Sequence, residues 1–324
     1  MAWQNAPVLT KLTAAQQGGN RGAQLWGVDL KGKLYTIYQK TPGGEWSNWM
    51  GPEWAPTNHP KQVYELAACQ LGDGALKLWI LDSKHEIWTV EQGVQGGDWN
   101  GWWHSTNTKW NNAQWTFKRM AATQTASGAM FIGVKDDGQL AVAFWGGGRW
   151  TRWRDNWHAT PQNSRWIEFT ACKQGDGRVA YWGLDDHCQL WGAGEKEKST
   201  GNMGDWNGPN WLGAPKLRNI AAVEGSHGAI IIGQDEQYRV VANFQSAPGS
   251  NTWTGWSQPG WSNAPKSYEL TAAGQNNGLA QIWAVTVRQK ITSIAQRDAT
   301  HWPDAWSDRD DDTYPPPPAK PSKK

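Results

Sequence analysis

The chain has 324 residues, with 37 glycines and 27 tryptophans, and its formal net charge is +2. Hydrophobic residues make up 38% and charged residues 19%, which is typical of a turn-rich, aromatic-rich folded protein rather than a disordered one. No basic cluster occurs before the last residues, which argues against a nucleic-acid partner or binding to an anionic membrane, because either needs a patch of Lys and Arg.

The chain consists of six similar repeats of about fifty residues. Each repeat opens with a short strand of small residues, such as Leu-Thr-Ala-Ala at 12–15. Small side chains suit a crowded centre where the first strands of several sheets converge, as in a β-propeller. A glycine-rich turn leads to a second strand, exemplified by residues 23–28, whose aromatic and β-branched content fits a strand packed on both faces. A tight turn at 29–32 precedes a third strand at 33–39. The following Trp-x-x-Trp segment is expected to form the fourth, outermost strand.

The Trp-x-x-Trp motif recurs about every fifty residues, and it divides the chain into six repeats. The first copy is formed by Trp46 and Trp49, and the later copies start at Trp99, Trp150, Met203, Trp253 and Trp302. No helical period of useful length appears, so the sequence predicts an all-β, six-bladed β-propeller of four-stranded antiparallel blades, with seven blades as the alternative. Two tryptophans three apart on a strand point to opposite faces, so one motif is expected to fill the spaces on both sides of its blade.

A third tryptophan usually follows each motif behind turn-forming residues. The sixth copy lies at the other end of the chain, because Trp3-Gln4-Asn5-Ala6-Pro7 matches residues 261–265 and nothing equivalent follows Trp306. We therefore expect the N-terminal segment to close the ring beside the sixth repeat. Residues 1–307 are predicted to form one domain, and the acidic, then proline-rich and lysine-ending tail at 308–324 is expected to be disordered.

The first residues have neither a basic region nor an apolar run, and no window approaches the roughly eighteen apolar residues of a membrane span. We expect no signal peptide and no membrane insertion. Cys69, Cys172 and Cys188 cannot build a disulfide framework, and the first two fall at equivalent places typical of small core residues. A cytoplasmic location, or release without a classical signal peptide, is therefore expected.

The composite pattern at residues 12–49 resembles the tectonin-like and Photorhabdus-lectin-like β-propeller lectins. It reads Leu-Thr-Ala-Ala, Gln-Leu-Trp-Gly-Val-Asp, Lys-Gly-Lys-Leu-Tyr and Gly-Gly-Glu-Trp-Ser-Asn-Trp, and the likeness spans residues 3–307. The Photorhabdus-type members have seven blades, whereas this chain supplies six repeats. The resemblance implies a sugar-binding protein with shallow pockets between adjacent blades, and fucosylated or O-methylated glycans as leading ligands.

The turn tryptophans are the first candidates for sugar contact, because they should lie near the surface, where a flat indole stacks on the apolar face of a pyranose. They are Trp3, Trp54, Trp110, Trp157, Trp211 and Trp261. Packing between blades is the alternative for them, and the expectation for the Trp-x-x-Trp and Trp26 series. Partners for sugar hydroxyls are expected at one aligned position after the third strand, since amides both donate and accept. These are Gln39, Gln92, Glu195, Gln245 and Gln296, with Trp145 replacing them in the third repeat. The alternative is an exposed strand-end polar residue.

Catalysis finds little support in the sequence. No carboxylate pair recurs as a glycosidase needs, and the Asp29 series falls where a hairpin turn favours Asp. The seven histidines lack zinc-site spacing, so we predict no catalytic residue, metal or cofactor. The sequence favours a non-enzymatic, multivalent lectin that binds glycans on cell surfaces, because equivalent weak sites multiply avidity. A propeller scaffold for protein partners and a sialidase- or glycosidase-like enzyme are the alternatives, and homo-oligomer formation is left open.

Overall fold

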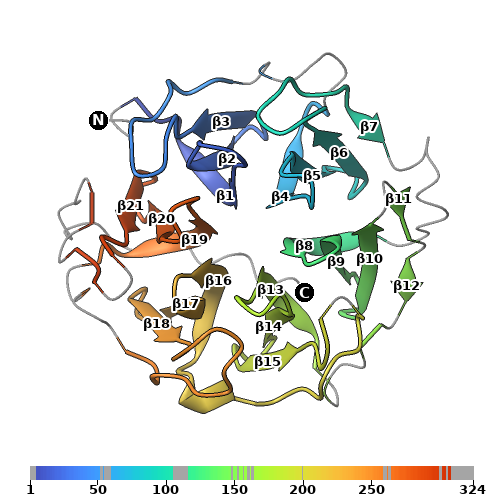
Figure 1. Ribbon diagram of the computed structural model, residues 1–324, viewed down its shortest axis with the longest axis vertical. Coiled ribbons are helices and arrows are strands. Elements are labelled where there is room, and N and C mark those ends of the chain that lie inside the picture. Colours follow the sequence, from blue (N-terminus) through green and yellow to red (C-terminus); the bar gives the residue numbers. More distant parts are fainter. Residues whose placement is uncertain are drawn as a thin grey trace.

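The protein is a ring of six antiparallel sheets, shown in Figure 1, with the first strand of each sheet nearest the centre. The computed structural model describes residues 5–51, 54, 60–104, 116–146, 149–151, 153–155, 157–158, 161, 164–198, 200–257, 261, 264–298, 301–303 and 306–307. Trp3, Trp110 and the predicted tail at 308–324 lie outside the described residues. The six-bladed prediction is confirmed.

The strands follow the repeat in order around the ring. Blade 1 contains β1 (Leu9–Gln16), β2 (Ala23–Asp29) and β3 (Leu34–Tyr38), and blade 2 contains β4 (Val63–Gln70), β5 (Leu76–Asp82), β6 (Ile87–Glu91) and β7 (Trp103–His104). Blade 3 contains β8 (Phe117–Thr125), β9 (Gly128–Lys135), β10 (Leu140–Gly146), β11 (Arg149–Trp150) and β12 (Arg154–Asp155), and blade 4 contains β13 (Trp166–Lys173), β14 (Val179–Asp185) and β15 (Leu190–Gly194). Blade 5 contains β16 (Leu217–Gly225), β17 (Gly228–Asp235) and β18 (Val240–Phe244), and blade 6 contains β19 (Ser267–Gly274), β20 (Ala280–Thr286) and β21 (Ile291–Ala295). A 3-10 turn, η2 (Trp211–Gly213), lies between β15 and β16. Among the described residues, no helix is long and apolar enough to cross a membrane.

The prediction of four regular strands in every blade is wrong. Within the described residues, blades 1, 4, 5 and 6 have three strands, blade 2 has four and blade 3 has five. The outer Trp-x-x-Trp segment usually joins the third strand only by isolated bridges, such as Gln39 with Trp46. The reason is visible in blade 1, where Trp46 and Trp49 both pack into the cluster shared with blade 6. A regular strand alternates its side chains, so a segment that turns both indoles to the same side cannot keep strand geometry.

The core consists of clusters between neighbouring blades. In the cluster that joins blade 1 to blade 6, Leu9 and Leu25 pack with Trp283 and Val285. Ala6 packs against this cluster, as Ala264 and Ala214 do at the two preceding junctions. The N-terminal segment thus takes the place that a turn segment takes elsewhere in the ring, and the ring is closed.

Every first strand carries a register irregularity after its first residue, which the sequence pattern did not reveal. In blade 1 the shift lies between Leu9 and Lys11. Equivalent shifts occur in the other five blades. The residues after the bulges are Lys11, Glu65, Arg119, Glu168, Asn219 and Glu269. Four of them line the central channel, namely Glu65, Glu168, Asn219 and Glu269, and the cations of Lys11 and Arg119 contact these carboxylates. Bulges re-aim the following side chain, and here they gather five charged side chains and Asn219 into a ring.

Candidate functional site

The main candidate site is an open cleft of about 700 Å³ between blades 4 and 5. Its lining residues come from blades 4 and 5. Their sheets, β13-β14-β15 and β16-β17-β18, are neighbours in the ring (Figure 1). Its lining combines three tryptophans, Trp182, Trp211 and Trp253, with charged residues at the rim. A concave surface with aromatic walls and a few polar groups is typical of a small-molecule site.

Small residues on blade 4 create the space. Ala180 in β14 and Gly192 in β15 both line the cleft, in the ladder where Ala180 pairs with Gly194 and Gly192 pairs with Trp182. A Cβ atom on Gly192 would lie 2.9 Å from Nε1 of both Trp182 and Trp211. Such a contact is too close, so only glycine at this position allows both indoles to pack directly against the sheet.

The three indoles contact one another edge to face. Trp211 lies 4.8 Å from Trp253 and 5.8 Å from Trp182, measured between ring centroids, with interplanar angles of 80° and 71°. Trp182 is 1% exposed, whereas Trp211 and Trp253 are half-buried. The backbone oxygen of Trp211 accepts a hydrogen bond from Trp256 Nε1 at 3.3 Å, which ties the turn to blade 5. Trp182 is therefore the buried member that packs behind the other two, and Trp211 and Trp253 present ring surface to the cleft.

Arg178 lies at the rim, immediately before β14. Its Nε donates to Asp176 at 2.6 Å, its Nη2 to the Gly249 oxygen of blade 5 at 2.7 Å, and its Nη1 to the Glu195 oxygen at 3.4 Å. These bonds use three of the five N–H donors of a guanidinium, so the others can face a ligand. The side chain also fixes the blade 5 loop against blade 4, which holds the cleft in shape.

Two carboxylates that line the cleft lie in different environments. Glu195 is buried, and its oxygens accept from the backbone nitrogens of Val179 at 2.9 Å and Gly201 at 3.1 Å. Asp205 is exposed at the rim. Asp205 can accept hydrogen bonds from ligand hydroxyls, whereas the Glu195 carboxylate is used to order the loop beneath it.

A second cleft, of about 590 Å³, lies between blades 5 and 6. Ile230, Phe244 and Trp302 give it an apolar wall, and Ser226, Ser246, Thr254 and Ser257 add hydroxyl groups. Trp261 lies behind this wall, 5.1 Å from Trp302 between ring centroids, and is 2% exposed. The surface position predicted for Trp261 is therefore wrong, because blade packing covers its ring.

The other turn tryptophans in the described residues are partly accessible. Trp54 is half-buried and packs edge to face on Trp99, with centroids 5.1 Å apart. Trp157 is half-buried beside Tyr181, at 5.4 Å. Packing at a blade junction, the alternative for this series, is therefore observed for Trp54 and Trp157, and part of each of these two rings remains accessible. Their contact with sugar stays a prediction.

The aligned polar series after the third strand is buried, not exposed. In each of these residues one side-chain oxygen accepts a hydrogen bond from a backbone nitrogen at the start of the second strand in its own blade, at 2.8–3.3 Å. The pairs are Gln39 with Ala23, Gln92 with Leu76, Glu195 with Val179, Gln245 with Ala229 and Gln296 with Ala280. Their exposed fractions are 3–8%, so the alternative of an exposed strand-end residue is wrong. Three of them also line the two clefts: Glu195, Gln245 and Gln296.

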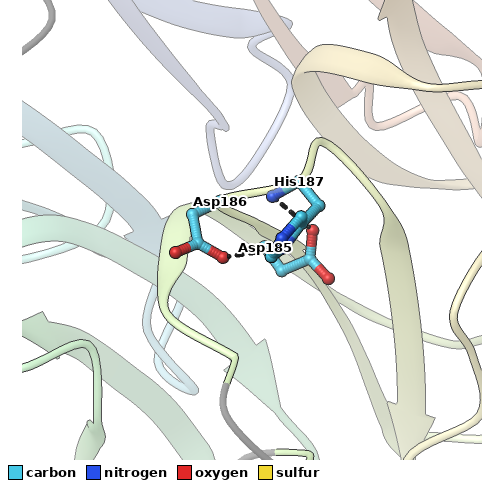
Figure 2. Close-up of side chains that lie close together, drawn as sticks. All are labelled: Asp185, Asp186 and His187. Atoms are coloured by element: carbon cyan, nitrogen blue, oxygen red, sulfur yellow. Dashed lines mark hydrogen bonds and ion pairs between the residues drawn. The ribbon is translucent and has the colours of Figure 1, made fainter.

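A cluster of Asp185, Asp186 and His187, drawn in Figure 2, is the one group among the described residues with metal-ligand side chains close together. The buried Asp185 carboxylate already accepts from the backbone nitrogens of His187 and Gln189 at 2.9 Å, and from Trp191 Nε1 at 2.9 Å. Asp186 and His187 are exposed and contact each other at 3.1 Å. The group is accounted for by the tight turn between β14 and β15, as expected for an Asp at this position.

Sequence reasoning missed the charged rim of the main cleft. Arg178 breaks the repeat, because the other repeats have small or apolar residues at the aligned position. These are Gly22, Ala75, Gly128, Gly228 and Leu279. That exception was readable in the sequence once the repeats were aligned. The place of Asp205 in the lining could not be predicted, because the repeat pattern does not show which residues of blades 4 and 5 meet at the cleft.

No protein-family model and no curated protein matches the chain. Solved structures do match. The fungal Aleuria aurantia lectin, described as a six-bladed β-propeller with a novel fucose recognition mode, is 13% identical over 92% of this chain and 95% of that one, with a TM-score of 0.60. AofleA from Arthrobotrys oligospora is 12% identical over 92% and 86%, with a TM-score of 0.61. The BP39L lectin from Burkholderia pseudomallei is 15% identical over 90% and 82%, with a TM-score of 0.57. These likenesses establish the six-bladed propeller fold.

Proposed function

We propose that the protein is a non-enzymatic, multivalent lectin and that the cleft between blades 4 and 5 binds a sugar. The observation that carries the proposal is that the aromatic rings of Trp211 and Trp253 and the charged side chains of Arg178 and Asp205 line the same cleft. Indole surface suits the apolar face of a pyranose, and the guanidinium and carboxylate supply donors and acceptors for its hydroxyls.

Fucosylated or O-methylated glycans on cell surfaces are the leading ligands. The repeat resembles tectonin-like and Photorhabdus-type lectins, and the Aleuria aurantia protein, which shares the fold, is described as a fucose-specific lectin. The cleft between blades 5 and 6 supplies a second site with a more apolar wall. Several weak sites on one rigid ring can raise apparent affinity for a dense glycan surface by about 10²–10⁴-fold.

A glycan array followed by calorimetry on the best ligand tests this function. We expect Trp211→Ala to weaken binding while the protein still melts cooperatively. The matched control is Trp103→Ala, because Trp103 is 55% exposed in β7 of blade 2 and outside the cleft. Equal binding by the Trp211 variant and the unaltered protein would place the site elsewhere. Absence of any glycan binding by the unaltered protein would favour the protein-scaffold alternative.

A further inference from the structure

The space between blades 2 and 3 is occupied by a lysine of the protein itself. Lys77, in β5, has a side chain that is 5% exposed. Its Nζ lies 5.8 Å from the ring centroid of Trp79, 5.4 Å from that of Trp145 and 5.5 Å from that of Trp150. Trp79 belongs to the same strand, and the other two come from β10 and β11 of the next blade (Figure 1). An ammonium within about 6 Å of several aromatic rings is attracted to their faces, and this is how aromatic cages hold quaternary ammonium ligands.

One carboxylate completes the surroundings of this ammonium. Lys77 Nζ pairs with Glu91, its neighbour across the β5–β6 ladder, whose side chain is 28% exposed. Burial lowers the pKa of Lys77, and the Glu91 carboxylate acts in the opposite direction. The cation is therefore held by one carboxylate and three indoles, as an external ammonium ligand would be.

The main cleft shows what the same place looks like without the lysine. Aligned through the repeat, four positions correspond between the two spaces: Lys77 to Ala180, Trp79 to Trp182, Trp145 to Gln245 and Trp150 to Trp253. The space with alanine is an open cleft of about 700 Å³. Between the two spaces, a long cationic side chain replaces alanine, and Trp145 takes the place of Gln245.

We propose that the space between blades 2 and 3 is an ammonium cage that Lys77 keeps closed, so that it takes no sugar. The residue at this position of the second strand decides which chemistry an inter-blade space accepts. The ring's sites are therefore unequal by construction. The statement about sugar rests on the proposed function, whereas the ammonium cage does not.

Removal of the lysine tests the cage directly. Lys77→Ala is expected to bind tetramethylammonium about tenfold more tightly than the unaltered protein, measured by tryptophan fluorescence or calorimetry, because the cation regains three indole faces and Glu91. Lys77→Met is the matched control, since its stem still fills the cage, and it should show no gain. The double variant Lys77→Ala with Trp145→Gln should lose most of the gain. A folded Lys77→Ala protein that binds tetramethylammonium no better than the unaltered protein would overturn the proposal.

The unaltered protein provides a second test that does not depend on a variant folding. Reductive methylation followed by peptide mass spectrometry should modify Lys77 at least about tenfold more slowly than Lys40, whose side chain is 55% exposed. Equal rates would contradict the closed cage. Ala180→Lys in the main cleft should abolish sugar binding there, and retained binding would overturn the claim that this position sets specificity. If the unaltered protein binds no sugar at all, the proposed function fails, and the tetramethylammonium and methylation results still decide the cage.

Discussion

Lys11 Nζ lies 3.3 Å from the Glu269 carboxylate, although 258 residues separate the two in the chain. The same ammonium lies 3.6 Å from Glu65 on its other side, so one lysine links blades 6, 1 and 2. Its pKa is raised because the attraction of Glu269 and Glu65 exceeds the effect of burial, which acts in the opposite direction and is the largest single influence. Arg119 continues the ring with Glu65 at 3.3 Å and Glu168 at 3.6 Å.

Breaking this ring should destabilise the propeller. Lys11→Met is expected to lower the free energy of unfolding by about 3 kcal/mol, because removing one partner of a buried ion pair leaves the other charge uncompensated. Urea unfolding measures the loss. The matched control is Lys40→Met, which breaks an exposed pair with Glu45 at 3.5 Å and should change stability by at most about 0.5 kcal/mol. Similar losses for both variants would show that the ring of charged side chains around the central channel contributes no more to stability than a surface ion pair.

The junction between the first and last blades should depend on the N-terminal segment. Ala6 packs into the cluster of Leu9 and Trp283, and Asn276 Nδ2 of blade 6 donates to the Gln17 oxygen of blade 1 at 2.6 Å. Deleting residues 1–7 removes part of this packing and should lower the melting temperature far more than deleting residues 313–324. Differential scanning calorimetry of the two truncated proteins checks this, and equal melting temperatures would contradict closure by the N-terminal segment.

Much of the fold could be predicted from the sequence because the repeat encodes local properties. The small residues at 12–15 fall inside β1, and the turn at 29–32 does join β2 to β3. The buried Trp26 and its equivalents also follow from local strand pattern. The outer segment failed, because its two indoles turn to one junction instead of alternating. That choice depends on the shape of the neighbouring blade and is invisible in a single repeat.

The site could be predicted only in part for the same physical reason. The sequence pointed to blade junctions and to Trp211, which does face the main cleft. It could not show that neighbouring side chains cover Trp261. Nor could it show that Ala180 leaves space between blades 4 and 5, whereas Lys77 occupies the equivalent space between blades 2 and 3. Each outcome depends on side-chain volumes brought together from two blades. An alignment of repeats shows equivalence of position, whereas accessibility depends on what the adjacent blade contributes.

Acid should weaken the junction between blades 3 and 4 through His158. Its ring stacks on Trp206, with centroids 4.8 Å apart, and its Nδ1 is paired with the buried hydroxyl of Tyr181. Burial lowers the pKa of His158, while Asp205 raises it to a smaller extent. The unfolded chain, with a histidine pKa of about 6.5, therefore takes up the proton at higher pH than the folded protein. Stability should fall as the pH drops below about 6.5 and continue to fall through the lower folded-state pKa.

A pair of histidine variants isolates this contribution. Urea unfolding at pH 7.5 and at pH 5.5 should show a smaller pH-dependent loss for His158→Asn than for the unaltered protein. His227→Asn serves as the control, because His227 is exposed. An unchanged pH dependence in the His158 variant would show that its protonation is not linked to folding.

Trp261 and Trp211 occupy the same place in the repeat, yet replacing Trp261 should act on stability and replacing Trp211 should act on glycan binding. Trp261 is 2% exposed and packs with Trp302 and Trp306, so Trp261→Ala is expected to lower the free energy of unfolding by about 3–5 kcal/mol by leaving a large cavity. Trp211 is half-buried at the open cleft, so Trp211→Ala should cost less stability and act chiefly on glycan binding.

Chemical unfolding and calorimetric titration of the two variants measure the contrast. Because a variant near its unfolding midpoint would lose binding indirectly, titrations are made at a temperature where both proteins are at least about 95% folded, which requires roughly 2 kcal/mol of remaining stability. Under that condition Trp261→Ala should retain the sugar affinity of the blade 4–5 cleft, since its ring lies at the next junction. Loss of that affinity in a folded Trp261 variant, with Trp211→Ala unaffected, would reverse the assignment of the two tryptophans.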